Sequence, residues 1–173
     1  MKQSTVVLEK LSTADSSDFR EGINDPQLRK MYGFPSQMEN EKITAIFERF
    51  CRMDHSFSIQ DAENHMIGFL LDVEPELSEK SLAVLKGQGR TLAFSIFPPY
   101  QRKGFMEKAL RNYIQLLFKD GEVDYIHCGH FYENTASRQL LDKLGFMNYG
   151  THSIKDKIIV DRILYREFAF HEF

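Results

Sequence analysis

Apolar and polar residues along the chain follow two different periods, and the changes of period predict alternating strands and helices. The stretch from Thr91 to Phe97 is apolar on both faces of an extended chain, which is typical of a strand buried inside a sheet. Pro98-Pro99 ends this strand because proline cannot donate to a sheet ladder. From Phe105 the apolar residues recur at helical spacing until Asp120-Gly121. We therefore expect a buried strand followed by an amphipathic helix.

The same patterns predict further elements on both sides of this centre. The expected strands are Thr5 to Leu11, Ser56 to Gln60, Met66 to Val73, Val123 to Tyr132, and a closing hairpin of Tyr149 to Ile154 with Ile158 to Phe168. The expected helices are one through Phe19 and Ile23, one from Asp25-Pro26 to Gly33, one capped by Ser36, one or two turns within Ser78 to Leu85, and one capped by Asn134 and Gly145.

The turn between the central strand and its helix is the first candidate for chemistry. It reads Gln101-Arg-Lys-Gly-Phe-Met106. A tight glycine turn at a helix N-terminus presents several backbone N–H groups in one place, and the helix dipole favours negative charge there. Arg102 and Lys103 add positive charge, so the turn fits a phosphate group. A basic connector in any α/β protein has the same appearance, and this alternative stays open.

Net charge and apolar runs exclude several classes of partner. The 173 residues carry 22 Lys and Arg against 25 Asp and Glu, a net charge of -3. Nucleic-acid-binding proteins usually show a strongly basic face, so nucleic acid is not an expected partner. No apolar run approaches the roughly 18 residues of a membrane span. No signal peptide precedes Val6, and we expect a cytoplasmic protein with no membrane partner.

Metal and nucleotide sites are not expected either. Cys51 and Cys128 have no metal-like pairing and are expected to be reduced core thiols. His127 and His130 lie three apart on a predicted strand, which directs them to opposite faces and away from a shared metal. The Gly87-Gln-Gly89 segment lacks a third glycine, and no P-loop lysine follows it. These features argue against a metal centre and against a nucleotide-phosphate enzyme.

Two motifs carry a resemblance to a known family. The order Ile96-x-Pro-x-x-Gln-x-x-Gly-x-Met106 resembles the acyl-CoA-binding signature of the GNAT acetyltransferase superfamily, with Met106 departing from the usual Gly or Ala. The segment Asn134-x-x-Ser-x-x-Leu-x-x-Lys-Leu-Gly-Phe146 resembles a second motif of that family. Asp161 to Tyr165 and Asn24 to Pro35 are similar to the branch that contains the ribosomal-protein N-terminal acetyltransferases.

The resemblance covers essentially the whole chain and implies one GNAT-like domain over residues 1–173. It implies an α/β (α+β) fold with a central mixed, mostly antiparallel sheet of six to seven strands. The sheet would be splayed between strands four and five and flanked by about four helices.

The resemblance also implies acetyl-CoA as a co-substrate and no metal. The residues that would hold its pyrophosphate are Gln101, Arg102, Lys103, Gly104, Phe105 and Met106. The backbone of Ser95, Ile96 and Phe97 would pair with the pantetheine arm, and Asn134 and Ser137 would line the far side of the cofactor.

The general base and acid of such a reaction are not obvious from the motifs. Many relatives carry Glu five residues before the Asn and Tyr seven residues after it, where this chain has Gly129 and Leu141. Strand alternation puts His127 on the face of Gly129, which makes it the candidate base; the alternative is a satisfied core histidine. Ser137 is the candidate acid for the leaving thiolate, and the alternative is an ordinary helix-start serine.

The expected activity is transfer of the acetyl group of acetyl-CoA to a primary amine by direct attack in a ternary complex. A protein or peptide N-terminus is one expected acceptor. Two alternatives stay open: an acetyltransferase of small amines such as polyamines or antibiotics, and a module that binds CoA without turnover. The missing Glu and Tyr support the last of these. A monomer and a homodimer both fit the sequence.

Overall fold

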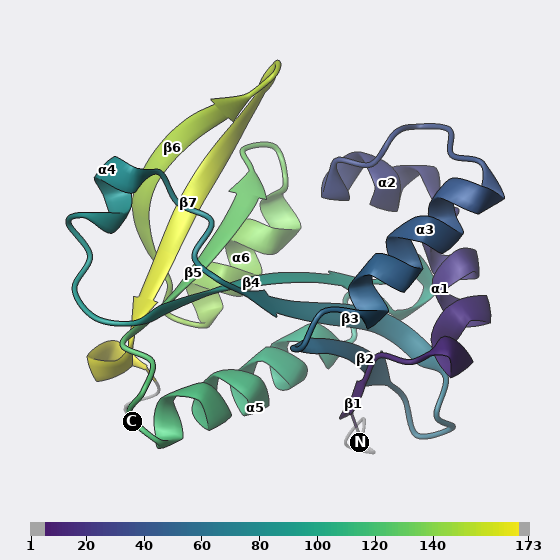
Figure 1. Ribbon diagram of the computed structural model, residues 1–173, viewed down its shortest axis with the longest axis horizontal. Helices are drawn as coiled ribbons and strands as arrows, with labels where there is room; N and C mark the ends of the chain where they lie inside the picture. The colour runs from purple at the N-terminus through teal and green to yellow at the C-terminus, as the bar shows by residue number, and fades with distance from the viewer. Residues whose placement is uncertain (1–5, 170–173) are drawn as a thin grey trace. The chain divides into compact units, whose positions relative to one another are not determined.

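Seven strands form one mixed sheet in the computed structural model, which describes residues 6–169 (Figure 1). The strands are β1 (Val7–Lys10), β2 (Ser56–Gln60), β3 (Met66–Val73), β4 (Gly89–Ile96), β5 (Tyr125–Phe131), β6 (Met147–Ile154) and β7 (Lys157–Tyr165). The α-helices are α1 (Ser16–Ile23), α2 (Pro26–Tyr32), α3 (Asn40–Cys51), α4 (Glu79–Leu82), α5 (Phe105–Lys119) and α6 (Thr135–Lys143). Thr5, the predicted start of the first strand, lies outside the described residues.

The strand order β1-β2-β3-β4-β5-β7-β6 confirms the predicted α/β (α+β) class. β4 and β5 pair in parallel, whereas the β1–β2, β2–β3, β5–β7 and β6–β7 pairs are antiparallel. The parallel ladder covers only Gly89–Thr91 and Tyr125–His127. A ladder of this length is what the predicted splay between the fourth and fifth strands requires.

The chain divides into two compact units, the first running to Leu71 and including Phe94–Ala109. In this unit the helices α1 and α3 pack together against strand β3 through aromatic rings (Figure 1). The ring centroids of Phe19 and Phe69 lie 5.8 Å apart, and those of Phe50 and Phe69 lie 5.5 Å apart. Phe19 and Phe69 are fully buried, so this cluster is the centre of the first core.

Two predicted helix caps of the first unit have different outcomes. The Asp25 side chain accepts a hydrogen bond from Leu28 N at 2.8 Å, and Gly33 ends α2 with φ +79°, as predicted. The prediction that Ser36 caps the next helix is wrong, since α3 begins at Asn40 after Glu39. The Ser36 carbonyl instead accepts a hydrogen bond from buried Arg29 at 3.0 Å, which fixes the connection between α2 and α3.

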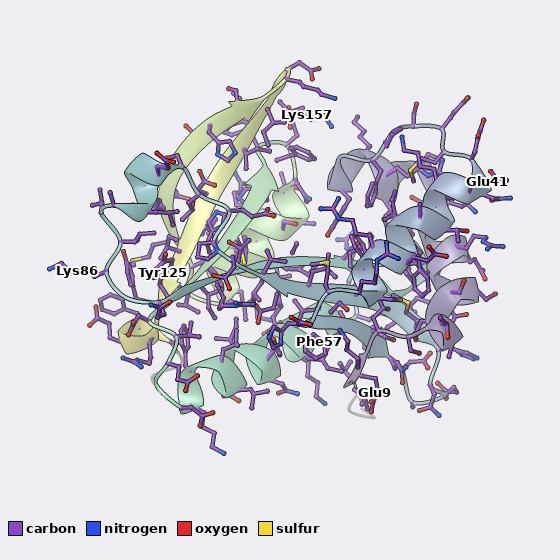
Figure 2. The ribbon with its side chains drawn as sticks, viewed as in Figure 1. Glu9, Glu41, Phe57, Lys86, Tyr125 and Lys157 are labelled. Carbon is purple, nitrogen blue, oxygen red and sulfur yellow. The ribbon has the colours of Figure 1, made fainter. Side chains whose placement is uncertain are left out.

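The second unit comprises Asp72–Ala93 and the residues from Leu110 onward. It contains the β6–β7 hairpin, with β5 paired on the other edge of β7. Figure 2 shows Lys157 near the tip of this hairpin, and its ammonium lies 4.3 Å from the centre of the Phe131 ring. Strand β6 is exposed along almost its whole length, whereas β7 is largely buried, because β7 lies between two strands.

Candidate functional site

The end of strand β4 is held against β3 within the first unit. Phe97 N donates a hydrogen bond to the Ile67 carbonyl at 2.8 Å. Backbone groups alternate between the two edges of a strand, so alternation from Phe97 predicts that the Ile96 amide faces the edge away from β3. Of the three residues predicted to pair with a pantetheine arm, Ile96 is therefore the one whose N–H points away from β3.

The turn after β4 is tied back to the strand it leaves. The Gln101 side-chain amide donates to the Ile96 carbonyl at 2.9 Å, and a 3-10 helix, Pro98–Tyr100, fills the space between them. Arg102 and Gly104 both have left-handed backbones, with φ +61° and +80°. A left-handed residue carrying a side chain costs roughly 1–2 kcal/mol, so the tight geometry at Arg102 is sustained by its surroundings.

The turn ends at the N-terminus of α5, and Gly104 accepts the first helical hydrogen bond from Lys108 N at 3.1 Å. Gly104 has no side chain that could cap the amides of the first helical turn. A Cβ built on Gly104 meets no protein atom within 4 Å. The backbone of this turn is therefore open to a group that approaches from outside, and the helix dipole favours an anion there.

The charged and aromatic side chains of the turn have separate positions. Arg102 and Lys103 are exposed, and within the described part of the chain neither forms an ion pair. Lys103 Nζ lies 5.6 Å from the centre of the Tyr100 ring, which packs edge-on against Phe105. Met106 is buried at 8% exposure. The side chain that departs from the family signature thus belongs to the core, and any contribution of Met106 to binding would come from its backbone.

Asn134 and Ser137 lie at the N-terminus of α6 in the second unit. Asn134 Oδ1 accepts a hydrogen bond from Ser137 N at 3.1 Å, so the asparagine is the N-cap, as predicted. Both side chains are partly exposed. Because the cap uses the Ser137 backbone, the Ser137 hydroxyl takes no part in it.

Leu141 and Phe146 stabilise the other end of α6. Phe146 N donates to the Leu141 carbonyl at 2.9 Å, Gly145 N donates to Asp142, and Gly145 has φ +87°. This is the Schellman arrangement expected from the Leu-Gly-Phe sequence. Leu141 is fully buried, so at the position where many relatives carry a tyrosine this chain has a core residue.

A line of hydrogen bonds connects His127 to three other strands of the second unit. His127 Nδ1 lies 2.9 Å from Thr91 Oγ1 on β4, and His127 Nε2 lies 3.0 Å from Asp161 Oδ1 on β7. The other oxygen of Asp161 accepts a hydrogen bond from His152 Nδ1 on β6 at 2.9 Å. Thr91, His127 and Asp161 are buried, whereas His152 is 45% exposed. The line therefore runs from the core to the surface.

The hydrogen bonds fix the protonation states along this line. Burial alone would raise the pKa of Asp161, but hydrogen bonds from His127 and His152 outweigh burial and hold that pKa below its usual value. Asp161 is therefore ionised, and both imidazoles donate to it. Thr91 Oγ1 accepts from Glu76 N at 3.0 Å, which leaves the threonine hydrogen for His127 Nδ1. Both His127 nitrogens are thus engaged inside the protein.

Gly129 lies beside the same line, as strand alternation predicts. It pairs with Asp161 in the β5–β7 register. A Cβ built on Gly129 would lie 3.9 Å from His127 Cε1 and 4.0 Å from Asp161 Oδ1. The carboxylate that position 129 lacks is therefore present nearby on the neighbouring strand.

The remaining candidate groups do not extend the site. Cys51 is partly buried and Cys128 fully buried, and both are free thiols; burial raises the pKa of Cys128, which makes this thiol inert. His130 Nδ1 donates a hydrogen bond to the Phe131 carbonyl at 2.9 Å and does not join the His127 line. Among residues 6–169 no cluster of three potential metal ligands occurs.

None of the helices in this range is long and apolar enough to cross a membrane.

Comparison with known proteins decides the family. A family model described as an acetyltransferase (GNAT) domain matches residues 5–147. The chain belongs to this family. A search of curated protein sequences gave no significant match.

The GNAT fold is also found in solved structures that cover nearly the whole chain. A GNAT acetyltransferase from Bacillus anthracis is 16% identical with a TM-score of 0.76, covering 95% of this chain and 98% of that one. A spermidine N-acetyltransferase from Vibrio cholerae, in complex with CoA and spermine, is 14% identical with a TM-score of 0.73, covering 94% and 96%. An aminoglycoside acetyltransferase in complex with coenzyme A is 18% identical with a TM-score of 0.70, covering 94% and 96%.

These matches leave the predicted subgroup without support. The family model identifies the GNAT family and the structures named above share its fold, and none of them favours the ribosomal-protein N-terminal branch. At such low identity the structures establish the fold alone.

In this GNAT chain the residues predicted from sequence fall in two places. Ser95 to Met106 lie in the first unit, and His127, Asn134 and Ser137 lie in the second. Sequence reasoning missed Thr91, Asp161 and His152. The sequence places Asp161 only in the segment Asp161 to Tyr165, and its contact with His127 becomes evident from the register of β5 against β7.

Proposed function

We propose that this GNAT protein transfers the acetyl group of acetyl-CoA to a primary amine by direct attack in a ternary complex. The observation that carries the proposal is the open turn at the start of α5. Gly104 places no side chain at the start of the helix, a Cβ built on it meets no protein atom within 4 Å, and exposed Arg102 and Lys103 flank it. A pyrophosphate needs N–H donors, positive charge and room for close approach to backbone, and this turn provides all three.

The end of β4 has the features needed to orient a thioester. Gln101 and the β3 contact of Phe97 hold the backbone on both sides of Ile96. Strand alternation predicts that the Ile96 N–H points away from β3, which would suit it to donate to the thioester carbonyl oxygen as negative charge develops there. One such donor is worth about 3–4 kcal/mol of transition-state stabilisation in other acyl-transfer enzymes.

Asn134 and Ser137 have separate roles in the proposal. The Asn134 cap holds the first turn of α6, so that the Ser137 hydroxyl is available to protonate the leaving thiolate. A helix N-terminus stabilises a developing thiolate, which reduces what is required of the hydroxyl. His127 stays the sequence-based candidate for the base, but it would have to release Thr91 or Asp161 before it could accept a proton directly.

The acceptor class is proposed more broadly than the motifs suggested. The spermidine N-acetyltransferase with bound spermine and the aminoglycoside acetyltransferase share the fold of this chain. We include peptide α-amines, polyamines and aminoglycosides as acceptors, since all offer a primary amine. We propose that the protein is a monomer or a homodimer, with no preference between the two. We also propose that it is located in the cytoplasm.

A thiol-release assay tests the proposal. Purified protein is incubated with acetyl-CoA and, in separate reactions, a short peptide with a free N-terminus, spermidine and neomycin. Amine-dependent release of CoA thiol with at least one class is the expected result. Tight binding of acetyl-CoA with no thiol release from any amine would instead support a CoA-binding module, as the missing Glu and Tyr suggest.

A further inference from the structure

Strand β6 forms one edge of the sheet and is exposed along almost its whole length. It ends the strand order and, among the described strands, pairs with β7 alone (Figure 1). Seven of its eight residues are exposed. The half-buried residue is Tyr149, whose hydroxyl donates a hydrogen bond to the Ser81 carbonyl in α4 at 3.0 Å. Helix α4 therefore contacts β6 at one residue and leaves the rest of the strand uncovered.

The composition of β6 does not protect this edge from pairing. The strand contains no Lys, Arg, Asp, Glu or Pro. Natural sheets avoid joining edge to edge through short edge strands, charged side chains, prolines and bulges. β6 has a bulge near its start, between Asn148 and Gly150, but its register with β7 is regular from Gly150 to Ile154. This regular part presents backbone N–H and C=O groups that another strand can bind.

The other edge of the sheet is protected. Strand β1 has only four residues, and two of them, Glu9 and Lys10, are exposed and charged. Short length and charge are both among the features that prevent pairing with another chain. The two edges therefore differ, and β6 is the one suited to pairing.

The bulge makes the apolar positions of β6 complementary to themselves. Met147 pairs with Ile163 and Ile154 pairs with Lys157, and these two β7 residues share a face because they are an even number apart. Met147 and Ile154, which are 45% and 54% exposed, therefore lie on one face. If two β6 strands run antiparallel about Thr151, and the bulge takes up one residue of each, Met147 of each copy lies opposite Ile154 of the other. Opposed apolar side chains stabilise a pair of strands.

We propose that β6 pairs antiparallel with β6 of a second copy of this chain, about a twofold axis at Thr151, which joins the two sheets into one. A twofold axis makes the interface isologous, so the Met147–Ile154 contact occurs twice from a single sequence. This inference selects the homodimer over the monomer. It concerns assembly and does not depend on acetyl transfer.

An extended peptide is the other occupant that an exposed strand edge accepts. The apolar residues at the two ends of β6 favour the second copy, because β6 itself carries matching residues at the required spacing. A peptide would have to supply apolar residues at the same two positions.

Size-exclusion chromatography with light scattering measures the assembly, and wild type should be a dimer. Thr151 is exposed, and Thr151→Lys places two ammonium groups opposite each other at the axis. Like charges across an interface cost several kcal/mol, so the dimer Kd should rise by about 10²-fold or more. The matched control is Val7→Lys on the β1 edge, because Val7 is also an exposed edge-strand residue. It should stay dimeric.

Mixing variants of opposite charge tests the position of the axis. Thr151→Asp should also be monomeric, and an equimolar mixture with Thr151→Lys should form a heterodimer, because opposite charges directly across a ladder stabilise the pair. A dimer in Thr151→Lys alone, or a mixture that stays monomeric, would overturn the proposal. A wild-type monomer would overturn it as well and leave the edge to an extended peptide. None of these results depends on thiol release, so acetyl transfer is tested separately.

Discussion

At the scale of single residues, Ser137 combines a structural and a proposed chemical role in different atoms. Its backbone N–H completes the Asn134 cap, and its hydroxyl is outside that bond. Ser137→Ala should therefore leave stability nearly unchanged and CoA affinity within a few-fold. We expect it to lower kcat by at most about 10²–10⁴-fold, the usual range for general-acid help. Steady-state kinetics beside a melting curve check this, and normal turnover would make Ser137 a helix-start residue only.

The position of Leu141 removes one apparent way to test this role. A tyrosine there would restore the group found in many relatives. Leu141 is fully buried, however, and adding volume to a packed core typically costs about 1–3 kcal/mol. The phenol would disrupt the core under α6, so rate changes in such a variant would not report on the leaving thiolate.

The contribution of Asp161 to the unfolding free energy is expected to depend on pH. Its pKa is lowered in the folded protein, so its contribution to stability is complete above the unfolded-state value of about 3.9 and is lost as the pH falls through the folded-state value. Asp161→Asn should reduce the unfolding free energy by about 1–3 kcal/mol at pH 7. The difference from wild type should shrink below about pH 4.

Urea unfolding at pH 7 and at pH 3 measures this difference. Asp156→Asn is the control, because Asp156 is exposed in the hairpin turn and such surface changes stay within about 0.5 kcal/mol. A deficit of Asp161→Asn that grows at acidic pH would contradict the ionised state assigned to Asp161.

At the scale of elements, helix α1 fixes the end of β4 through one close approach. A Cβ built on Gly22 would lie 2.3 Å from the Phe97 ring. Gly22→Ala should gain at most about 1 kcal/mol of helix propensity but lose about 1–3 kcal/mol by overpacking. The net effect should be destabilising, and displacement of Phe97 should weaken CoA binding.

Thermal melting and calorimetric titration with CoA test the Gly22 variant. Gly150→Ala is its matched control, because a Cβ at Gly150 meets nothing within 4 Å. We expect the control to match wild type in both measurements. If Gly22→Ala also matched wild type, then Phe97 would not depend on α1 for its position.

The elements also show what local sequence could and could not predict. The caps of α2 and α6 were predictable, because Asp25, Gly33, Asn134 and Gly145 act on neighbouring residues. The start of α3 was not, since the Ser36 carbonyl is used by Arg29 seven residues earlier. The long-range case is Asp161: the sequence suggests which residues share a face of β7, but the register against β5 and β6 is set by distant pairings.

At the scale of the whole molecule, the protonation state of the acceptor sets the preferred amine. An α-amino group has a pKa near 7.7–8, so about a tenth is neutral at pH 7, against roughly one in 2,500 for a lysine side chain. The chain lacks a glutamate at Gly129, and both nitrogens of His127 are hydrogen-bonded inside the protein. We expect faster acetylation of a peptide N-terminus than of a lysine side chain at pH 7 and equal concentration.

Competition between two peptides measures this preference. One peptide has a free N-terminus and no lysine, and the other has a blocked N-terminus and one lysine; mass spectrometry follows both products. Faster modification of the lysine peptide would contradict the argument from amine protonation.

The most direct test of the account is binding of acetyl-CoA to the turn before α5. Calorimetric titration would compare wild type, Gly104→Glu and Gly145→Glu. Gly104 and Gly145 have nearly the same left-handed backbone, with φ +80° and +87°, so both substitutions carry a strain of about 1–2 kcal/mol. We predict that Gly104→Glu abolishes binding while the protein stays folded and that Gly145→Glu binds as wild type does. Unchanged affinity in Gly104→Glu would contradict the assignment of this turn to the pyrophosphate.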